Sequence, residues 1–212
     1  MKRFVAVTAI LLLTAPVFAQ TAAKPPAAAP KPATAANAAA PKPAPEMERI
    51  NKLFGGRWNT AEKFDPSEMM PQGGEGNGTE SFRPGPGGFS MISEYSSVGP
   101  MGQYTGHGII FWAAPEHAYH FYWFDSAKPE FSTLICTWVG DNLVAVGTEN
   151  VLGKKMITRH TFSEIKSDSF VYTIEMGPTS SSLKRVMTIN YSKANPEDMW
   201  RRKMSGILPP KP

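Results

Sequence analysis

The side chains best suited to chemistry are few in this chain. It has 212 residues with four histidines, at positions 107, 117, 120 and 160, and one cysteine, Cys136. No Cys or His spacing matches a zinc site, and no Gly-x-Ser-x-Gly sequence marks a nucleophilic serine. Cys136 lies in an apolar run, so we expect a buried and unreactive thiol. These observations predict no metal site, no catalytic residue and no cofactor.

Acid and base groups do occur within segments that alternate like strands. Glu62 and Glu80 lie in early segments, and Glu94 and Asp125 in later ones. General acid and base catalysis requires two such groups at hydrogen-bonding reach, and spacing along the chain does not provide that. A pair formed by His160 with Glu62 or Glu94 would favour an enzyme of the isomerase or hydrolase type.

Two histidines flank the turn near Pro115. If the turn is centred on this residue, His120 faces Ile110 and His107 faces Trp123 on the neighbouring strand. Because side chains alternate along a strand, this register places His107 and His120 on opposite faces of the sheet. The register predicts no metal site between them.

Aromatic side chains are dense between residues 109 and 124. Both faces of that hairpin are apolar, so one face should fill an interior and the other should be covered by a partner, the helix or the C-terminal tail. One interpretation is an ordinary packed core. The other is a cavity that holds a small hydrophobic molecule. The residues predicted to bind that molecule are Tyr104, Tyr119, Phe121, Trp123, Arg159 and His160.

These residues lie in a long series of short extended segments that follows one helix. Residues 46–54 have apolar side chains at helical spacing, after Pro45 and before Gly55 and Gly56. From there to residue 192 the period is two, and Gly, Pro, Asn and Asp recur roughly every ten residues. Strands are predicted at 57–65, 76–83, 88–98, 103–113, 117–125, 131–139, 142–150, 155–165, 169–176 and 183–192.

Consecutive strands with short turns must dispose of two sheet edges, and closure removes both. We therefore predict an all-β fold, an up-and-down antiparallel β-barrel of about ten strands. The barrel domain should span residues 46–194, with a C-terminal tail at 195–212.

The region before the barrel is typical of an exported protein. Lys2 and Arg3 precede a 12-residue apolar run, and small residues lead to Ala19, so residues 1–19 are predicted to be a signal peptide. The apolar run is shorter than the roughly 20 residues that a membrane-spanning helix needs, so no permanent span is expected. Residues 20–45, rich in Ala, Pro and Lys, are predicted to be a disordered linker. The expected location is the periplasm or the exterior.

The net charge of +4 does not point to nucleic acid, because the basic excess lies in the termini. Residues 46–195 contain 13 Lys and Arg against 16 Asp and Glu, a charge of −3. A nucleic-acid-binding domain would carry a basic stripe of its own.

A family resemblance accompanies this layout. The short helix followed by Gly56-Arg57-Trp58 resembles the Gly-x-Trp signature that opens lipocalin-like (calycin) barrels. Further segments resemble a bacterial family within that superfamily, known only as a domain of unknown function: Phe89–Tyr95, Gly102–Gly108, Tyr119–Asp125, Gly140–Gly147 and Met187–Tyr191. The resemblance implies that Trp58 closes one barrel end under a basic residue of the last strand, Arg185 or Lys193. It implies no activity.

Three functions remain open at this point. The first is an exported barrel that binds a small hydrophobic molecule in its interior. The second is a structural or interaction protein that forms a homodimer through an aromatic outer face. The third is the barrel enzyme of isomerase or hydrolase type.

Overall fold

The computed structural model of the chain describes residues 41–195. The predicted barrel domain, residues 46–194, lies inside this range. The predicted signal peptide at 1–19, linker residues 20–40 and tail residues 196–212 lie outside the described residues.

One helix, α1 (Pro45–Phe54), precedes the strands and begins one residue earlier than predicted. Pro45 occupies the first turn, where its missing N–H removes no helical hydrogen bond. Glu46 and Glu48 complement the positive end of the helix dipole, and Gly55 ends the helix. No helix within residues 41–195 has the length and apolarity to cross a membrane. The side of α1 that faces the barrel buries Met47, Ile50 and Phe54.

Ten strands follow, each within two residues of its predicted bounds. They are β1 (Gly56–Phe64), β2 (Gly74–Pro84), β3 (Ser90–Gly99), β4 (Gly102–Ala113), β5 (Ala118–Asp125), β6 (Ser132–Val139), β7 (Asn142–Val151), β8 (Lys154–Ser163), β9 (Ser169–Gly177) and β10 (Lys184–Lys193).

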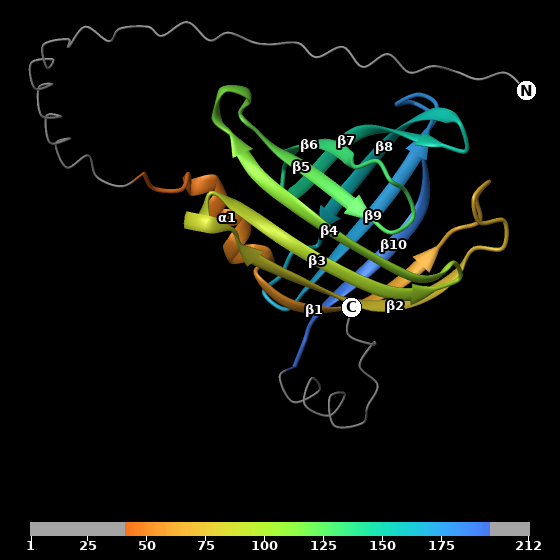
Figure 1. The fold of residues 1–212 in the computed structure, drawn as a ribbon, viewed down its shortest axis with the longest axis horizontal. Coiled ribbons are helices and arrows are strands. Elements are labelled where there is room, and N and C mark those ends of the chain that lie inside the picture. Colours follow the sequence, from red (N-terminus) through yellow and green to blue (C-terminus); the bar gives the residue numbers. More distant parts are fainter. Residues whose placement is uncertain (1–40, 196–212) are drawn as a thin grey trace, which may run out of the picture. The chain divides into compact units, whose positions relative to one another are not determined.

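The strands form a closed antiparallel barrel in sequence order, which confirms the predicted fold class. Each strand pairs with the next, and β10 returns to pair with β1 from Trp58 opposite Lys193 to Phe64 opposite Met187. In Figure 1, β1 and β10 lie side by side and α1 stands at one end of the strands. Closure leaves no unpaired sheet edge.

The predicted register between β4 and β5 is wrong by one residue. His120 lies opposite Phe111 rather than Ile110, and His107 lies opposite Phe124 rather than Trp123. The connection is a short 3-10 turn, Ala114–Glu116, followed by His117 in the left-handed region at φ 50°. Its centre therefore falls after Pro115, not on it, and the shift places His107 and His120 on the same outer face.

The Gly-x-Trp stretch closes the barrel end at α1. Trp58 is fully buried, and its indole N–H donates to the carbonyl of Phe54 at 2.6 Å. The Lys193 ammonium lies 4.1 Å from the Trp58 ring centroid and donates to the Gly55 carbonyl at 2.6 Å. Of the two basic residues predicted for this position, Lys193 is therefore the one that covers the ring. Arg185 instead pairs with Asp65 at 2.7 Å.

Packed side chains fill the barrel next to α1. Phe54 contacts three phenylalanine rings of the barrel, with centroids 5.2 to 6.2 Å apart. Cys136 belongs to this core, and burial raises the pKa of its thiol to about 12. The expectation of a buried, apolar thiol is confirmed.

Candidate functional site

The half of the barrel away from α1 contains a cavity of about 390 Å³. All ten strands contribute to its wall, and its outer part reaches the loops at residues 65–73, 99–102, 126–131 and 151–153. Phe82 and Phe162 line it and also contact Phe54 of α1, so the packed core forms its floor. Most of the wall is apolar or aromatic, as in sites for small organic molecules.

Four of the six predicted ligand-binding residues line this cavity: Tyr104, Phe121, Trp123 and His160. They come from β4, β5 and β8 and face inward because they alternate with outward residues along each strand. The structure therefore brings these four together around one space.

Arg159 and Tyr119 do not line the cavity, which corrects two of the predicted positions. Arg159 precedes the inward His160 on β8, so its side chain lies on the outer face and forms a two-point ion pair with Glu175 of β9 at 2.7 and 2.8 Å. That contact lowers the pKa of the Glu175 carboxyl. Tyr119 points inward but lies near the closed end, where its hydroxyl donates to the Glu46 carbonyl at 3.0 Å. Tyr119 therefore anchors α1.

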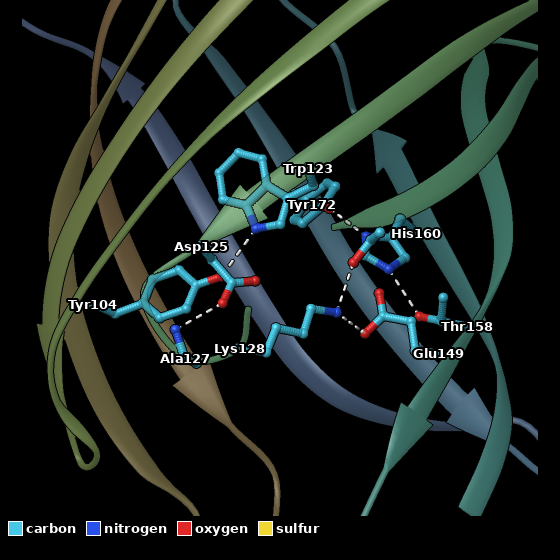
Figure 2. Close-up of polar contacts among 10 residues, drawn as sticks. Tyr104, Trp123, Asp125, Ala127, Lys128, Glu149, Thr158, His160 and Tyr172 are labelled. Atoms are coloured by element: carbon cyan, nitrogen blue, oxygen red, sulfur yellow. Dashed lines mark hydrogen bonds and ion pairs between the residues drawn. The ribbon is translucent and has the colours of Figure 1, made fainter. Parts of the chain in front are cut away.

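Three rings form one side of the cavity and are called here the ring group: Tyr95 of β3, Tyr104 of β4 and Trp123 of β5. The Tyr95 ring meets Tyr104 at 5.9 Å and Trp123 at 6.2 Å, both edge to face. The Trp123 indole donates to the Tyr104 hydroxyl at 3.0 Å (Figure 2). These contacts hold the rings in a fixed arrangement beside the open space.

His160 is buried and both of its ring nitrogens are engaged. Nε2 lies 2.8 Å from the Thr158 hydroxyl, and Nδ1 bonds the Tyr172 hydroxyl, as Figure 2 shows. Burial lowers the pKa of His160 to about 4, so its ring is neutral at pH 7. Because both ring nitrogens are already hydrogen-bonded, His160 contributes the shape and polarity of its ring to the cavity wall.

The pairing of His160 with Glu62 or Glu94, which an isomerase or hydrolase would need, is not formed in the structure. The His160 ring bonds Thr158 and Tyr172 instead. Glu94 lies on the exposed outer face of β3, 3.4 Å from Arg83. The acid–base pair that favoured an isomerase or hydrolase does not form. Within residues 41–195, no group of three or more His, Cys, Asp or Glu side chains is placed to hold a metal ion.

Two buried carboxyl groups lie on the inward faces of β1 and β2, one in the cavity wall and one behind it. Glu80 lines the cavity and accepts a hydrogen bond from Tyr191 at 2.6 Å. Desolvation raises the pKa of Glu80 to about 7, although the Tyr191 hydrogen bond acts in the opposite direction. Glu62, on β1, accepts hydrogen bonds from the hydroxyls of Tyr95 and Thr60.

Glu80 and Tyr95 were not among the predicted ligand-binding residues. Each occupies a position on the inward face of its strand: Glu80 two residues before the inward Phe82, and Tyr95 directly opposite Glu80 in the register. A carboxylate on the apolar face of a strand is the sequence signal that would have identified this site.

The outer part of the cavity carries one ion pair. The ammonium of Lys128 lies 3.0 Å from Glu149 and 2.8 Å from the Ser132 hydroxyl (Figure 2). Asp125 accepts a hydrogen bond from the backbone N–H of Ala127 at 2.8 Å. Charged groups thus surround the outer part of the cavity, while aromatic rings line its inner part.

Comparison with known proteins extends the description of the fold. No protein-family model matches the chain, and no curated protein matches it in sequence. Among solved structures, Rv2717c from M. tuberculosis is 11% identical with a TM-score of 0.53, over 73% of this chain and 100% of that chain.

Two further solved structures are similar to the chain at lower TM-scores. A de novo designed fluorescence-activating β-barrel is 15% identical with a TM-score of 0.39, over 68% of this chain and 97% of that one. The EF1p2_mFAP2b structure bound to DFHBI is 14% identical with a TM-score of 0.39, over 70% of this chain and 99% of that one. At such low identity these likenesses concern the fold alone.

Proposed function

We propose that this chain is an exported barrel protein that binds a small, largely apolar molecule in its interior. The observation that carries the proposal is the cavity of about 390 Å³, bounded by the packed core at one end. Its volume lies within the range of about 300 to 1,000 Å³ that is usual for small-molecule sites. The ring group and His160 supply a few fixed polar atoms in a wall that is mostly apolar or aromatic, and its charged residues are Glu80, Asp125, Lys128 and Glu149.

The rigidity of the wall also supports binding. The cavity lies inside a closed barrel whose ten strand pairs are all hydrogen-bonded. A ligand entering such a site orders few side chains, so little of its binding free energy is lost to conformational entropy.

A titration with Nile red, a neutral apolar dye, tests the proposal. We expect saturable binding with a rise and blue shift of the dye emission. The variant Ile174→Trp replaces an aliphatic side chain of the cavity wall on β9 with a bulkier indole ring, which reduces the space for the dye. The dye affinity should fall by about tenfold or more.

Matched controls separate the cavity from the outer surface. Thr173→Trp adds the same ring to the adjacent position of β9, which faces outward, and should leave the dye affinity unchanged. Equal affinities for both variants, with their folds intact by circular dichroism, would place the dye elsewhere. Absence of any saturable binding would reject the proposal.

A second candidate function rests on an aromatic patch on the outer face of β4 to β6. This outer patch consists of His107, Ile109, Phe111, Tyr122, Phe124 and Phe131. The rings of Phe124 and Phe131 stack at 5.3 Å, and Phe131 remains 53% exposed. None of its six residues is Lys, Arg, Asp or Glu, and the acidic residues at its border, Glu94 and Glu116, are paired with Arg83 and His120. Two copies of the chain can therefore meet there without burying an unpaired charge.

We propose a homodimer through this patch as the second candidate. Light scattering at increasing concentration should show a dimer that Phe124→Lys dissociates. Thr188→Lys, on the outer face of β10, is the control and should leave it intact. A wild-type chain that stays monomeric at high concentration would exclude this function.

Export and the calycin relationship are proposals as well. Export is supported by the sequence of residues 1–19, and it predicts a mature chain that begins at Gln20 in the periplasm or medium. The calycin relationship is supported by the position of Trp58 beneath Lys193. It predicts that homologues will retain the glycine and tryptophan at positions 56 and 58.

A further inference from the structure

The acidic groups of the cavity outnumber its basic ones. Among the lining residues in the described part of the chain, Glu80, Asp125 and Glu149 are acidic and Lys128 is the one lysine or arginine. Lys128 is already paired with Glu149. No lysine or arginine of residues 41–195 forms an ion pair with Glu80 or Asp125. Within the described part of the chain, two acidic groups of the wall therefore lack a cationic partner.

A third carboxyl group, that of Glu62, lies directly behind the cavity wall and adds to the excess of acidic over basic groups. Glu62 is 3% exposed and bonds the Tyr95 hydroxyl, which belongs to the cavity wall. Its second oxygen, Oε2, is buried and has no hydrogen-bond partner among the described residues. Buried polar atoms almost always have a partner, so this oxygen is an unsatisfied acceptor directly behind the cavity wall.

The ring group stands beside these carboxyl groups. Tyr95 lies directly opposite Glu80 in the β2–β3 register, and Tyr104 and Trp123 pack around Tyr95. The faces of aromatic rings attract cations, and several rings near an acidic group form the usual binding site for organic ammonium ions.

We propose that the cavity selects an apolar cation, an organic amine or quaternary ammonium ion. The charged group lies between the ring group and Glu80, and the hydrocarbon part packs against Phe121 and Leu134. This inference rests on the proposed function, because it specifies the class of molecule that enters the same cavity. A neutral ligand would leave the two acidic groups without a cationic partner, and an anion would be repelled by them.

The test compares three small probes of similar shape. Phenyltrimethylammonium is the cation, tert-butylbenzene is its neutral isostere, and benzoate is an anion. Each competes with Nile red for the full-length protein at pH 8. We expect phenyltrimethylammonium to displace the dye at about tenfold lower concentration than tert-butylbenzene, and benzoate to displace it least.

Two variants locate the preference at the acidic wall. Glu80→Gln keeps an acceptor for the Tyr191 hydroxyl and should remove most of the advantage of the cation over its isostere. Asp125→Asn keeps the acceptor for the Ala127 N–H and should reduce that advantage in part. Glu94→Gln, on the outer face, is the matched control and should change nothing.

The wild-type protein provides a test that needs no substitution. Glu80 faces Tyr191, Tyr95 and Tyr172, with Glu62 beyond Tyr95, and no basic group contributes to its titration. Because burial raises the pKa of Glu80 to about 7, the carboxyl becomes mostly anionic between pH 6 and 8. Affinity for phenyltrimethylammonium should therefore rise by up to about tenfold over that range, while affinity for tert-butylbenzene stays constant.

The outcomes separate this inference from the proposed function. If tert-butylbenzene or benzoate displaces Nile red as well as the cation does, the cavity binds apolar molecules without selecting cations, and the inference fails alone. If Nile red itself does not bind the cavity, both fail. A cation preference that Glu80→Gln leaves intact would also overturn the inference.

Discussion

Glu80 should make the stability of the protein depend on pH in an unusual direction. Its pKa is raised from the ordinary value of 4.5 to about 7, because the folded barrel removes its carboxyl group from water. The folded state therefore holds this proton more tightly than the unfolded chain does. Stability from this group is largest below about pH 4.5 and is lost as the pH rises through about 7.

The magnitude follows from the size of the shift. One pKa unit corresponds to about 1.4 kcal/mol, so the raised pKa of Glu80 lowers the stability of the folded state by about 3 kcal/mol at pH 8. At pH 5 it lowers the stability by about 1 kcal/mol, because there the unfolded chain is ionised at this position and the folded chain is not. Glu80→Gln keeps the hydrogen bond from Tyr191 and carries no ionisable proton. Relative to the wild type, the variant should gain about 2 kcal/mol between pH 5 and 8.

His160 acts in the opposite sense over a lower range. Its pKa is lowered from 6.5 to about 4, so the unfolded chain binds a proton that the folded one excludes. Stability is lost as the pH falls from about 6.5 toward about 4. The difference between the variant and the wild type cancels this contribution, because both proteins contain His160.

Urea unfolding followed by tryptophan fluorescence at several pH values between 5 and 8.5 measures the difference. Glu94→Gln, at an exposed position on β3, should follow the wild-type curve throughout. A free-energy difference between Glu80→Gln and the wild type that stays constant with pH would show that the folded state does not raise the pKa of Glu80, and it would refute the reasoning.

Three further predictions concern the closed end of the barrel. Lys193→Met removes the cation from the Trp58 ring and should lower the free energy of unfolding by about 1 kcal/mol in urea, whereas Lys184→Met at the far end of β10 should not. Gly56→Ala should lower the free energy of unfolding by about 1–2 kcal/mol and with it the melting temperature, because φ is 118° and the new Cβ would lie 2.8 Å from the Lys193 ammonium. An unchanged melting curve would contradict this. Cys136 should react with a disulfide reagent only after unfolding, since burial raises the pKa of its thiol to about 12; rapid reaction of the native protein would show an accessible thiol.

Local sequence patterns were sufficient to predict the elements of this fold. Residues with period two between turn residues identified the ten strands, because a strand that divides an interior from water must alternate its side chains. The position of Trp58 at the closed end was implied by the resemblance of Gly56-Arg57-Trp58 to the Gly-x-Trp signature, and in the structure Gly56 has φ 118° and Trp58 is buried.

Positions within the barrel depended on the closed structure. Alternation identifies which residues of one strand share a face. A turn that is one residue longer shifts the register of the hairpin, and this shift put His107 and His120 on the same face instead of on opposite faces. Tyr119 and Trp123 share a strand face, yet one anchors α1 and the other lines the cavity, because only their depth along the barrel differs.

The sequence by itself therefore determined a barrel of about ten strands, and the family resemblance added the tryptophan at its closed end. Only the tertiary structure decided that half of the interior is open and that Glu80 faces this space. The physical reason is that a cavity is the small difference between the volume that ten strands enclose and the volume of the side chains within it. Both quantities depend on closure, which joins residues as distant in sequence as Glu80 and Tyr191.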